Sequence, residues 1–182
     1  MALRKQIGEG TNLAYSQMQM GWIALNNAQV GEAEAYLRDA VVTFKKIDLR
    51  DAVIAADAML SQVLLAQGKT DEAAKLAFHA AELAKKTTTQ AQKFDAALAV
   101  ARVSVAQGKV AEALRSTQEV LATATRYGFV GYQMDARLLL AETLARSGKQ
   151  QQARAQATTL VKDAQAKGYG RIEREASKLV KP

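Results

Sequence analysis

The chain has 182 residues, with no cysteine, one histidine and one proline. These counts exclude a disulfide framework, a thiolate metal site, a metal site built on two histidines, and a cysteine nucleophile. The 25 basic and 18 acidic residues give a formal net charge of +7 at pH 7, and 49% of the residues are hydrophobic, which is enough to bury a core.

The N-terminal segment, MALRKQIGEG, is short and basic, and it lacks the apolar stretch of a secretory signal. No window of the chain approaches eighteen uninterrupted apolar residues, so we expect no membrane-spanning helix. The absence of cysteine agrees with a reducing compartment. We therefore expect a soluble, cytoplasmic protein.

Four copies of one pattern of small residues stand forty residues apart and fill residues 9–168. One column of the pattern holds alanine in every copy: Ala33, Ala73, Ala113 and Ala153. A second column, twelve residues earlier, holds other small residues: Gly21, Ser61, Ala101 and Ala141. A strict long period of this kind predicts a repeat array, in which each unit buries its apolar face by stacking on its neighbours.

Within each copy, apolar residues recur at helical spacing on both sides of a turn. The first helices are expected at about 11–27, 50–67, 90–107 and 130–147. The second helices are expected at about 30–47, 70–86, 110–127 and 150–167. Gly68, Gly108 and Gly148 mark three of the turns, because glycine reaches the left-handed conformation that ends a helix at low cost. Ala28 holds this position in the first copy, and we expect Gly31 to serve that turn instead.

The junction between copies also recurs at the front of the chain. Ile7 and Gly8 align with Ile47 and Asp48, so residues 1–8 are interpreted as the end of a preceding, truncated repeat. Asp48 is expected to cap the helix that begins near residue 50. We infer that the chain was cut from the C-terminal part of a longer protein.

The register continues beyond the fourth copy. Tyr169 to Val180 align with the start of another first helix, and this segment is rich in Arg, Lys and Glu. A charged half-copy at the end of an array is typical of a helix that closes it. Residues 169–182 are therefore predicted to form a C-terminal capping helix.

These columns resemble those of tetratricopeptide repeat (TPR) proteins over about residues 10–180. The resemblance implies an all-α fold, a right-handed superhelical solenoid of antiparallel helix pairs with four TPR-like repeats plus the capping helix. The chain departs from the family in its forty-residue period and in the absence of proline at the ends of the copies. It also departs where the family usually has a large aromatic residue, because these positions hold Gln17, Asp57, Ala97 and Arg137.

Little in the sequence favours an enzyme. A serine triad would have to be built on His79, the one histidine, which lies in the middle of a second helix. An isolated histidine without an orienting partner is more typical of the surface or of packing. The Gly-Lys pairs recur as turns and lack the flanking pattern of a phosphate-binding loop. We expect no catalytic residue, no metal site and no cofactor.

In TPR arrays the first helices line the concave surface, so the resemblance implies a binding groove on that face. The expected groove residues are Tyr15, Met18, Trp22, Asn26, Gln62, Asp95, Arg102, Asp135, Leu138, Glu142 and Arg146. An apolar side chain of a partner would be anchored near Trp22 and Met18, with polar contacts at Arg102 and Glu142. Two alternatives stay open: Trp22 can pack against a preceding repeat, and Arg102 can pair with Glu142.

The predicted function is that of a non-catalytic scaffold that binds a protein or peptide. The alternative is a C-terminal regulatory or sensor segment of a larger bacterial signalling protein, such as a kinase or transcription regulator. We do not expect a nucleic acid as partner, because the aromatic residues are not interleaved with basic ones as a stacking platform requires. A homodimer through the apolar end at the first copy is a further expectation.

Overall fold

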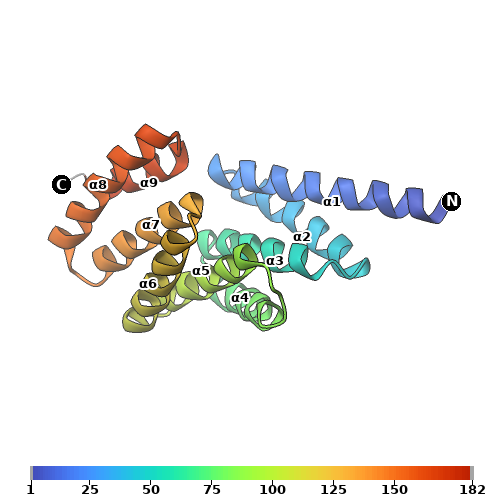
Figure 1. Ribbon diagram of the computed structural model, residues 1–182, viewed down its shortest axis with the longest axis horizontal. Helices are drawn as coiled ribbons and strands as arrows, with labels where there is room; N and C mark the ends of the chain where they lie inside the picture. The colour runs from blue at the N-terminus through green and yellow to red at the C-terminus, as the bar shows by residue number, and fades with distance from the viewer. Residues whose placement is uncertain (1, 181–182) are drawn as a thin grey trace. The chain divides into compact units, whose positions relative to one another are not determined.

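A computed structural model describes residues 2–180, with the side chains of residues 10–180 (Figure 1). This part of the chain forms nine helices and no strand. The helices are α1 (Ala2–Asn26), α2 (Val30–Lys46), α3 (Arg50–Ala66), α4 (Thr70–Ala84), α5 (Gln90–Ala106), α6 (Val110–Arg126), α7 (Val130–Arg146), α8 (Gln150–Lys167) and α9 (Gly170–Val180). The expected all-α fold and the order of first and second helices are confirmed. None of these helices is long and apolar enough to cross a membrane.

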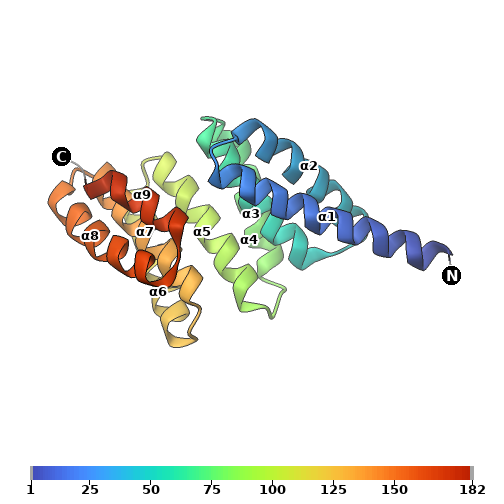
Figure 2. The same cartoon turned by 90° about the horizontal axis from the view of Figure 1, so that it is seen from above.

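The chain divides into two compact units, Met1–Val103 and Ser104–Pro182, and the division falls within α5. In the first unit, α1 packs on α2, α2 on α3, and α3 on α4. In the second unit, α6 packs on α7, and α7, α8 and α9 pack on one another. Figure 2 shows the antiparallel pair α1 and α2 side by side, at one edge of the first unit. Contacts between consecutive helices are what a repeat array requires.

Each second helix buries one stripe of residues spaced three or four apart. In α2 this stripe consists of Ala33, Leu37, Ala40, Val41 and Phe44. In α6 the same columns are occupied by Ala113, Thr117, Val120 and Ala124. Small side chains on this stripe let the first helix of the same copy approach closely. The core therefore follows from the period of the sequence.

The two small-residue columns meet in the first two helix pairs. The Ser61 hydroxyl donates a hydrogen bond of 2.9 Å to the carbonyl of Ala73, and Ser61 is fully buried. At Gly21 the approach is closer still, because a Cβ atom there would lie 2.7 Å from Cγ of Leu37. The same Cβ atom would lie 3.4 Å from the carbonyl oxygen of Ala33. The glycine is thus required by packing, and the contacts Gly21–Ala33 and Ser61–Ala73 explain the spacing of twelve residues between the columns.

The turns inside the copies follow the expected pattern with one exception. Gly68, Gly108 and Gly148 have φ angles of +76°, +76° and +79°. In the first copy Ala28 itself adopts φ +61°, at a cost of about 1 kcal/mol. Gly31 lies inside α2. The expectation that Gly31 would serve this turn is therefore wrong.

Asp48 does not cap α3. Its φ of +53° places it in the left-handed region, one residue before the N-cap position, which belongs to Leu49. The Asp48 carboxylate instead accepts a hydrogen bond of 3.1 Å from Nε of Arg50. The junction is closed by backbone geometry and by this local ion pair.

The two ends of the chain compare differently with the predictions made from the sequence. α1 is continuous from Ala2 through Ile7 and Gly8, so the turn expected at these two residues is absent. Met1, Lys181 and Pro182 lie outside the described residues. The interpretation of residues 1–8 as the end of a preceding repeat, and of 169–182 as a cap, stays a prediction. In the second unit, Ile172 and Ala176 of α9 are buried in the same cluster as Leu160 of α8.

Candidate functional site

The predicted groove residues all lie on first helices, as expected, but they are divided between the two units. In the first unit they are Tyr15, Met18, Trp22 and Asn26 of α1, Gln62 of α3, and Asp95 and Arg102 of α5. In the second unit they are Asp135, Leu138, Glu142 and Arg146 of α7. A single groove along all four copies therefore stays a prediction.

One column of the predicted groove is partly accessible in every copy. It consists of Trp22, Gln62, Arg102 and Glu142, and each of these residues is half-buried. The column one turn later behaves similarly: Asn26 and Ala106 are half-buried, and Ala66 and Arg146 are exposed. Side chains of this kind can contact a partner without first leaving the core.

Leu138 does not belong to an accessible face. It is 3% exposed and packs in the core of the second unit with Met134 and Leu160. Leu98, in the same column of the third copy, is also 3% exposed. This column is turned toward the second helices, and only Met18 is half-buried there. The assignment of Leu138 to the groove is therefore corrected, because its side chain is already occupied in the core.

Tyr15 and Asp135 each combine exposure with a structural contact. The ring of Tyr15 packs on Phe44 of α2 with centroids 5.0 Å apart, while 41% of the residue stays exposed. The Asp135 carboxylate accepts a hydrogen bond from the guanidinium of Arg171 on α9. Arg171 is not among the residues predicted from the sequence to contact Asp135, because the register of α9 against α7 is set only by tertiary packing.

Five further residues of the predicted groove also make polar, ionic or ring interactions within the protein: Trp22, Asn26, Asp95, Arg102 and Glu142. Partial burial together with such contacts restricts the rotamers of these side chains. A restricted side chain loses less conformational entropy when a partner binds.

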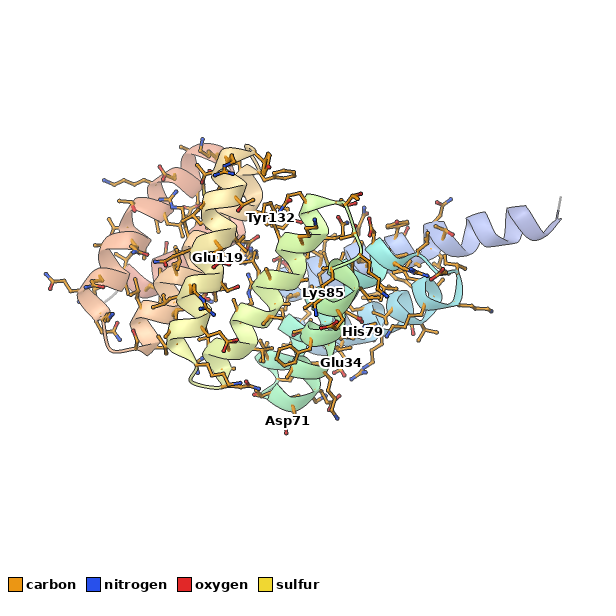
Figure 3. The ribbon with its side chains drawn as sticks, turned by 60° about the horizontal axis from the view of Figure 1, so that its bottom comes forward. Glu34, Asp71, His79, Lys85, Glu119 and Tyr132 are labelled. Atoms are coloured by element: carbon orange, nitrogen blue, oxygen red, sulfur yellow. The ribbon has the colours of Figure 1, made fainter. Side chains whose placement is uncertain are left out.

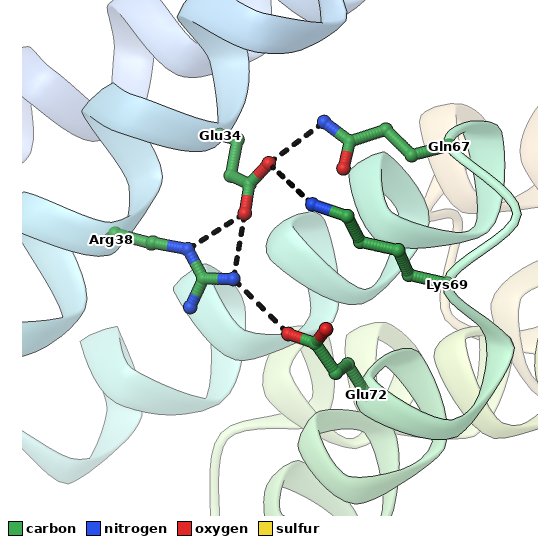
Figure 4. Close-up of polar contacts among 5 residues, drawn as sticks. All are labelled: Glu34, Arg38, Gln67, Lys69 and Glu72. Atoms are coloured by element: carbon green, nitrogen blue, oxygen red, sulfur yellow. Dashed lines mark hydrogen bonds and ion pairs between the residues drawn. The ribbon is translucent and has the colours of Figure 1, made fainter.

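A network of five polar residues connects the first copy to the second (Figure 4). The Glu34 carboxylate on α2 accepts hydrogen bonds from Nε of Arg38 at 2.8 Å, Nε2 of Gln67 at 2.8 Å and Nζ of Lys69 at 3.2 Å. The guanidinium of Arg38 also reaches Glu72 on α4, at 3.3 Å. The hydrogen bonds from Gln67 and Arg38 outweigh partial burial and lower the pKa of Glu34 to about 2. Ala74, Leu114 and Arg154 replace Glu34 in the later copies, so the network is particular to this junction.

A second polar cluster surrounds His79 on α4 (Figure 3). Its Nδ1 lies 2.5 Å from Oδ2 of Asp57, a residue of α3 that is fully buried. Nζ of Lys45 on α2 lies 3.9 Å from the other carboxylate oxygen. Burial raises the pKa of Asp57, opposed by the hydrogen bond from His79 and by the charge of Lys45. From the sequence we expect no orienting partner for His79, and Asp57 corrects that expectation.

His79 also lines a pocket of about 170 Å³ in the first unit. The lining residues are Phe44, Lys45, Asp48, Arg50, Val53, His79 and Leu83. This lining combines apolar side chains with charges of both signs and includes no hydroxyl or thiol nucleophile. Among residues 10–180, no group of three His, Asp or Glu side chains is arranged to hold a metal ion. No residue of the predicted groove contributes to this pocket.

Comparison with known proteins identifies the fold. No protein-family model matches the chain, and no curated protein matches it. A solved structure of a variant kinesin light chain-like protein from Podosopora anserina, with nearly identical TPR-like repeats, covers 94% of this chain and 92% of its own, with 20% identity and a TM-score of 0.62. A second structure of that protein covers 85% of this chain and 76% of its own, with 23% identity and a TM-score of 0.53.

The chain has a TPR-like fold. At this level of identity the likeness concerns the arrangement of the helices, and it confirms the resemblance that the columns of small residues indicate. The partner of a protein does not follow from its fold alone.

In three of the four copies, the column of Gln17, Asp57, Ala97 and Arg137 forms polar pairs where TPR proteins usually have a large aromatic residue. The side chain of the first helix is bonded there to the second helix of the same copy, and the third copy has Ala97 instead. These pairs are Gln17–Asp39 at 3.4 Å, Asp57–His79 at 2.5 Å and Arg137–Asp163 at 2.7 Å. The partners in the first two pairs are both 22 residues apart. This repeated spacing of polar residues is visible in the sequence and could have predicted the pairs. Directed polar bonds thus take the place of ring packing between paired helices.

Proposed function

We propose that this protein is a non-catalytic scaffold that binds a protein or peptide along the face formed by its first helices. The observation that supports this proposal is the column of Trp22, Gln62, Arg102 and Glu142, which stays half-buried in all four copies. Neighbouring positions on the same helices, such as Leu98 and Leu138, are buried in the cores. Accessible side chains at matching positions of successive first helices suit recognition of an extended or helical segment.

The chemistry of the column favours a partner segment with an apolar anchor and a polar remainder. Trp22 supplies a large apolar surface with one hydrogen-bond donor, which is typical of residues that dominate binding energy. Arg102 and Glu142 carry opposite charges, so polar groups of either sign would find a complement in the later copies. We further propose that the protein acts in the cytoplasm. Its alternative role as a regulatory segment of a larger bacterial signalling protein would use the same face.

The proposal is tested with peptides selected on the protein itself. A displayed library of random peptides is enriched on the wild-type chain. Single selected peptides then receive a fluorescent label, and their affinity for each variant is measured by fluorescence anisotropy, which does not depend on Trp22. Trp22 is the only tryptophan, so a change in intrinsic fluorescence reports contact at this face directly.

We expect Trp22→Ala and Arg102→Glu each to weaken binding by about tenfold or more. Phe78→Ala is the matched control, because Phe78 is 46% exposed on α4 and lies outside the predicted groove. Unchanged affinity in both groove variants would contradict the assignment of this face. Failure to enrich any peptide would contradict the scaffold proposal as a whole.

A further inference from the structure

The first helix of the first unit has an uncovered apolar face. Leu13, Met20 and Ile23 lie along one side of α1 and are 60%, 45% and 51% exposed. Asn12, Ser16 and Asn27 share that side and are exposed as well. Other residues of α1, among them Ala14 and Ala24, are buried in the core. The three large aliphatic side chains that the described part of α1 exposes therefore lie on one face.

The same face is a stacking interface in the next copy. Forty residues later, Val53, Leu60 and Val63 of α3 are 3%, 2% and 0% exposed, and they belong to the core shared with α2. Val103 in the third copy and Thr143 in the fourth copy, both in the column of Ile23, are fully buried. The face of α1 thus continues the columns that form the interface between copies. Its apolar residues stand at the same positions as those that pack against neighbouring helices in the later copies.

Charge limits which helices can pack there. From Gly10 to Asn27 the chain contains no charged residue, so this face is neutral throughout its described length. The chain as a whole carries a net charge of +7, so two copies repel each other at long range, and a neutral face adds no local repulsion between charged side chains. A face that meets its own copy across a two-fold axis must be self-complementary. A neutral face with three large apolar side chains meets this condition.

We propose that this α1 face, centred on Leu13, Met20 and Ile23, is a homodimer interface that binds the same face of a second copy of the chain. The two α1 helices cross on a two-fold axis near Met20, and each covers the apolar side chains of the other. The interface is separate from the column of Trp22, Gln62, Arg102 and Glu142, so loss of dimerisation and loss of peptide binding can be measured independently.

Sedimentation and light scattering over a range of protein concentrations test the proposal. We expect a reversible species of about 39 kDa, twice the 19.6 kDa of one chain. Ile23→Glu should weaken the dimer by about tenfold or more, because it places a charge against its own symmetry mate. Val42→Glu is the control: Val42 is 67% exposed on α2, and Glu82 occupies its column in the second copy.

The control variant should dimerise like the wild type, and circular dichroism should show that both variants keep their helices. If the protein is a monomer at every concentration, the proposal is overturned. The α1 face would then bind a segment of some other protein. A dimer that Ile23→Glu and Val42→Glu affect equally also overturns it.

A cross-linking experiment locates the interface directly. The chain has no cysteine, so Met20→Cys introduces a single thiol near the proposed axis. Under mild oxidation this variant should form a covalent dimer that a reductant reverses, and Val42→Cys should form far less. Equal cross-linking of the two variants would indicate random collision and would contradict the α1 interface.

Discussion

Replacing Gly21 by alanine tests the closest contact in the helix pairs. The new Cβ would lie 2.7 Å from Cγ and 3.1 Å from Cδ2 of Leu37. Leu37 is fully buried, and its Cγ atom is not the free end of the side chain, so the clash cannot be relieved by a simple rotation. The other copies avoid the problem by pairing a larger residue in the column of Gly21 with a smaller one in the column of Leu37. Those pairs are Ser61 with Ala77, Ala101 with Thr117, and Ala141 with Ala157.

The expected size of the effect follows from two opposing contributions. Overpacking a filled core costs about 2 kcal/mol. Alanine in place of glycine inside a helix returns about 1 kcal/mol. We therefore expect Gly21→Ala to reduce the free energy of unfolding by about 1 kcal/mol.

The sign should reverse when Leu37 is truncated. Leu37→Ala alone removes a fully buried side chain and should cost about 3 kcal/mol. In that background Gly21→Ala meets no clash, and its helix propensity should stabilise the protein by about 1 kcal/mol. The coupling between the two substitutions is then about 2 kcal/mol.

Urea denaturation followed by far-ultraviolet circular dichroism provides the four free energies of this cycle. Gly31→Ala is the matched control, because a Cβ atom on Gly31 would have nothing within 4 Å. We expect this control to be neutral or slightly stabilising in both backgrounds. An effect of Gly21→Ala that has the same sign and size with and without Leu37 would refute the packing argument.

Two further predictions concern the polar clusters. Because the folded state lowers the pKa of Glu34 from 4.5 to about 2, its carboxylate contributes stability above about pH 4.5, and this contribution is lost as the pH falls toward 2. This contribution of Glu34 to the free energy of unfolding is up to about 3 kcal/mol. Glu34→Gln should therefore be less stable than the wild type at neutral pH and converge with it in acid, as measured by urea titrations at each pH. Glu32→Gln, at an exposed site on the same helix and outside this network, is the matched control. His79→Ala leaves the buried Asp57 carboxylate without its hydrogen bond and should cost about 3 kcal/mol, partly recovered by adding Asp57→Asn. The neighbouring Phe78→Ala, at an exposed site, should cost less than about 1 kcal/mol, and an equal loss in both variants would show that the bond to Asp57 contributes nothing.

The sequence alone predicts the architecture of this protein, because helices and turns are encoded locally. The period of forty residues, the helical spacing of apolar residues and Gly68, Gly108 and Gly148 predict the helix pairs and their turns. The exceptions are Ala28 and the front of α1. At Ala28 the chain accepts a strained angle rather than shifting the turn to Gly31, because the register of α2 is held by its buried stripe.

Which column faces the core and which faces outward was decided only by the tertiary structure. Leu138 and Glu142 are one helical turn apart on α7, yet Leu138 is buried and Glu142 is half-buried. That difference depends on the angle at which α8 and α9 pack on α7, and local spacing does not contain this angle. The bonds Asp57–His79, Glu34–Gln67 and Asp135–Arg171 likewise join side chains that lie 22, 33 and 36 residues apart. The sequence by itself thus determined a stack of TPR-like helix pairs, whereas the packing angles between helices decided which polar residues became partners and which remained accessible.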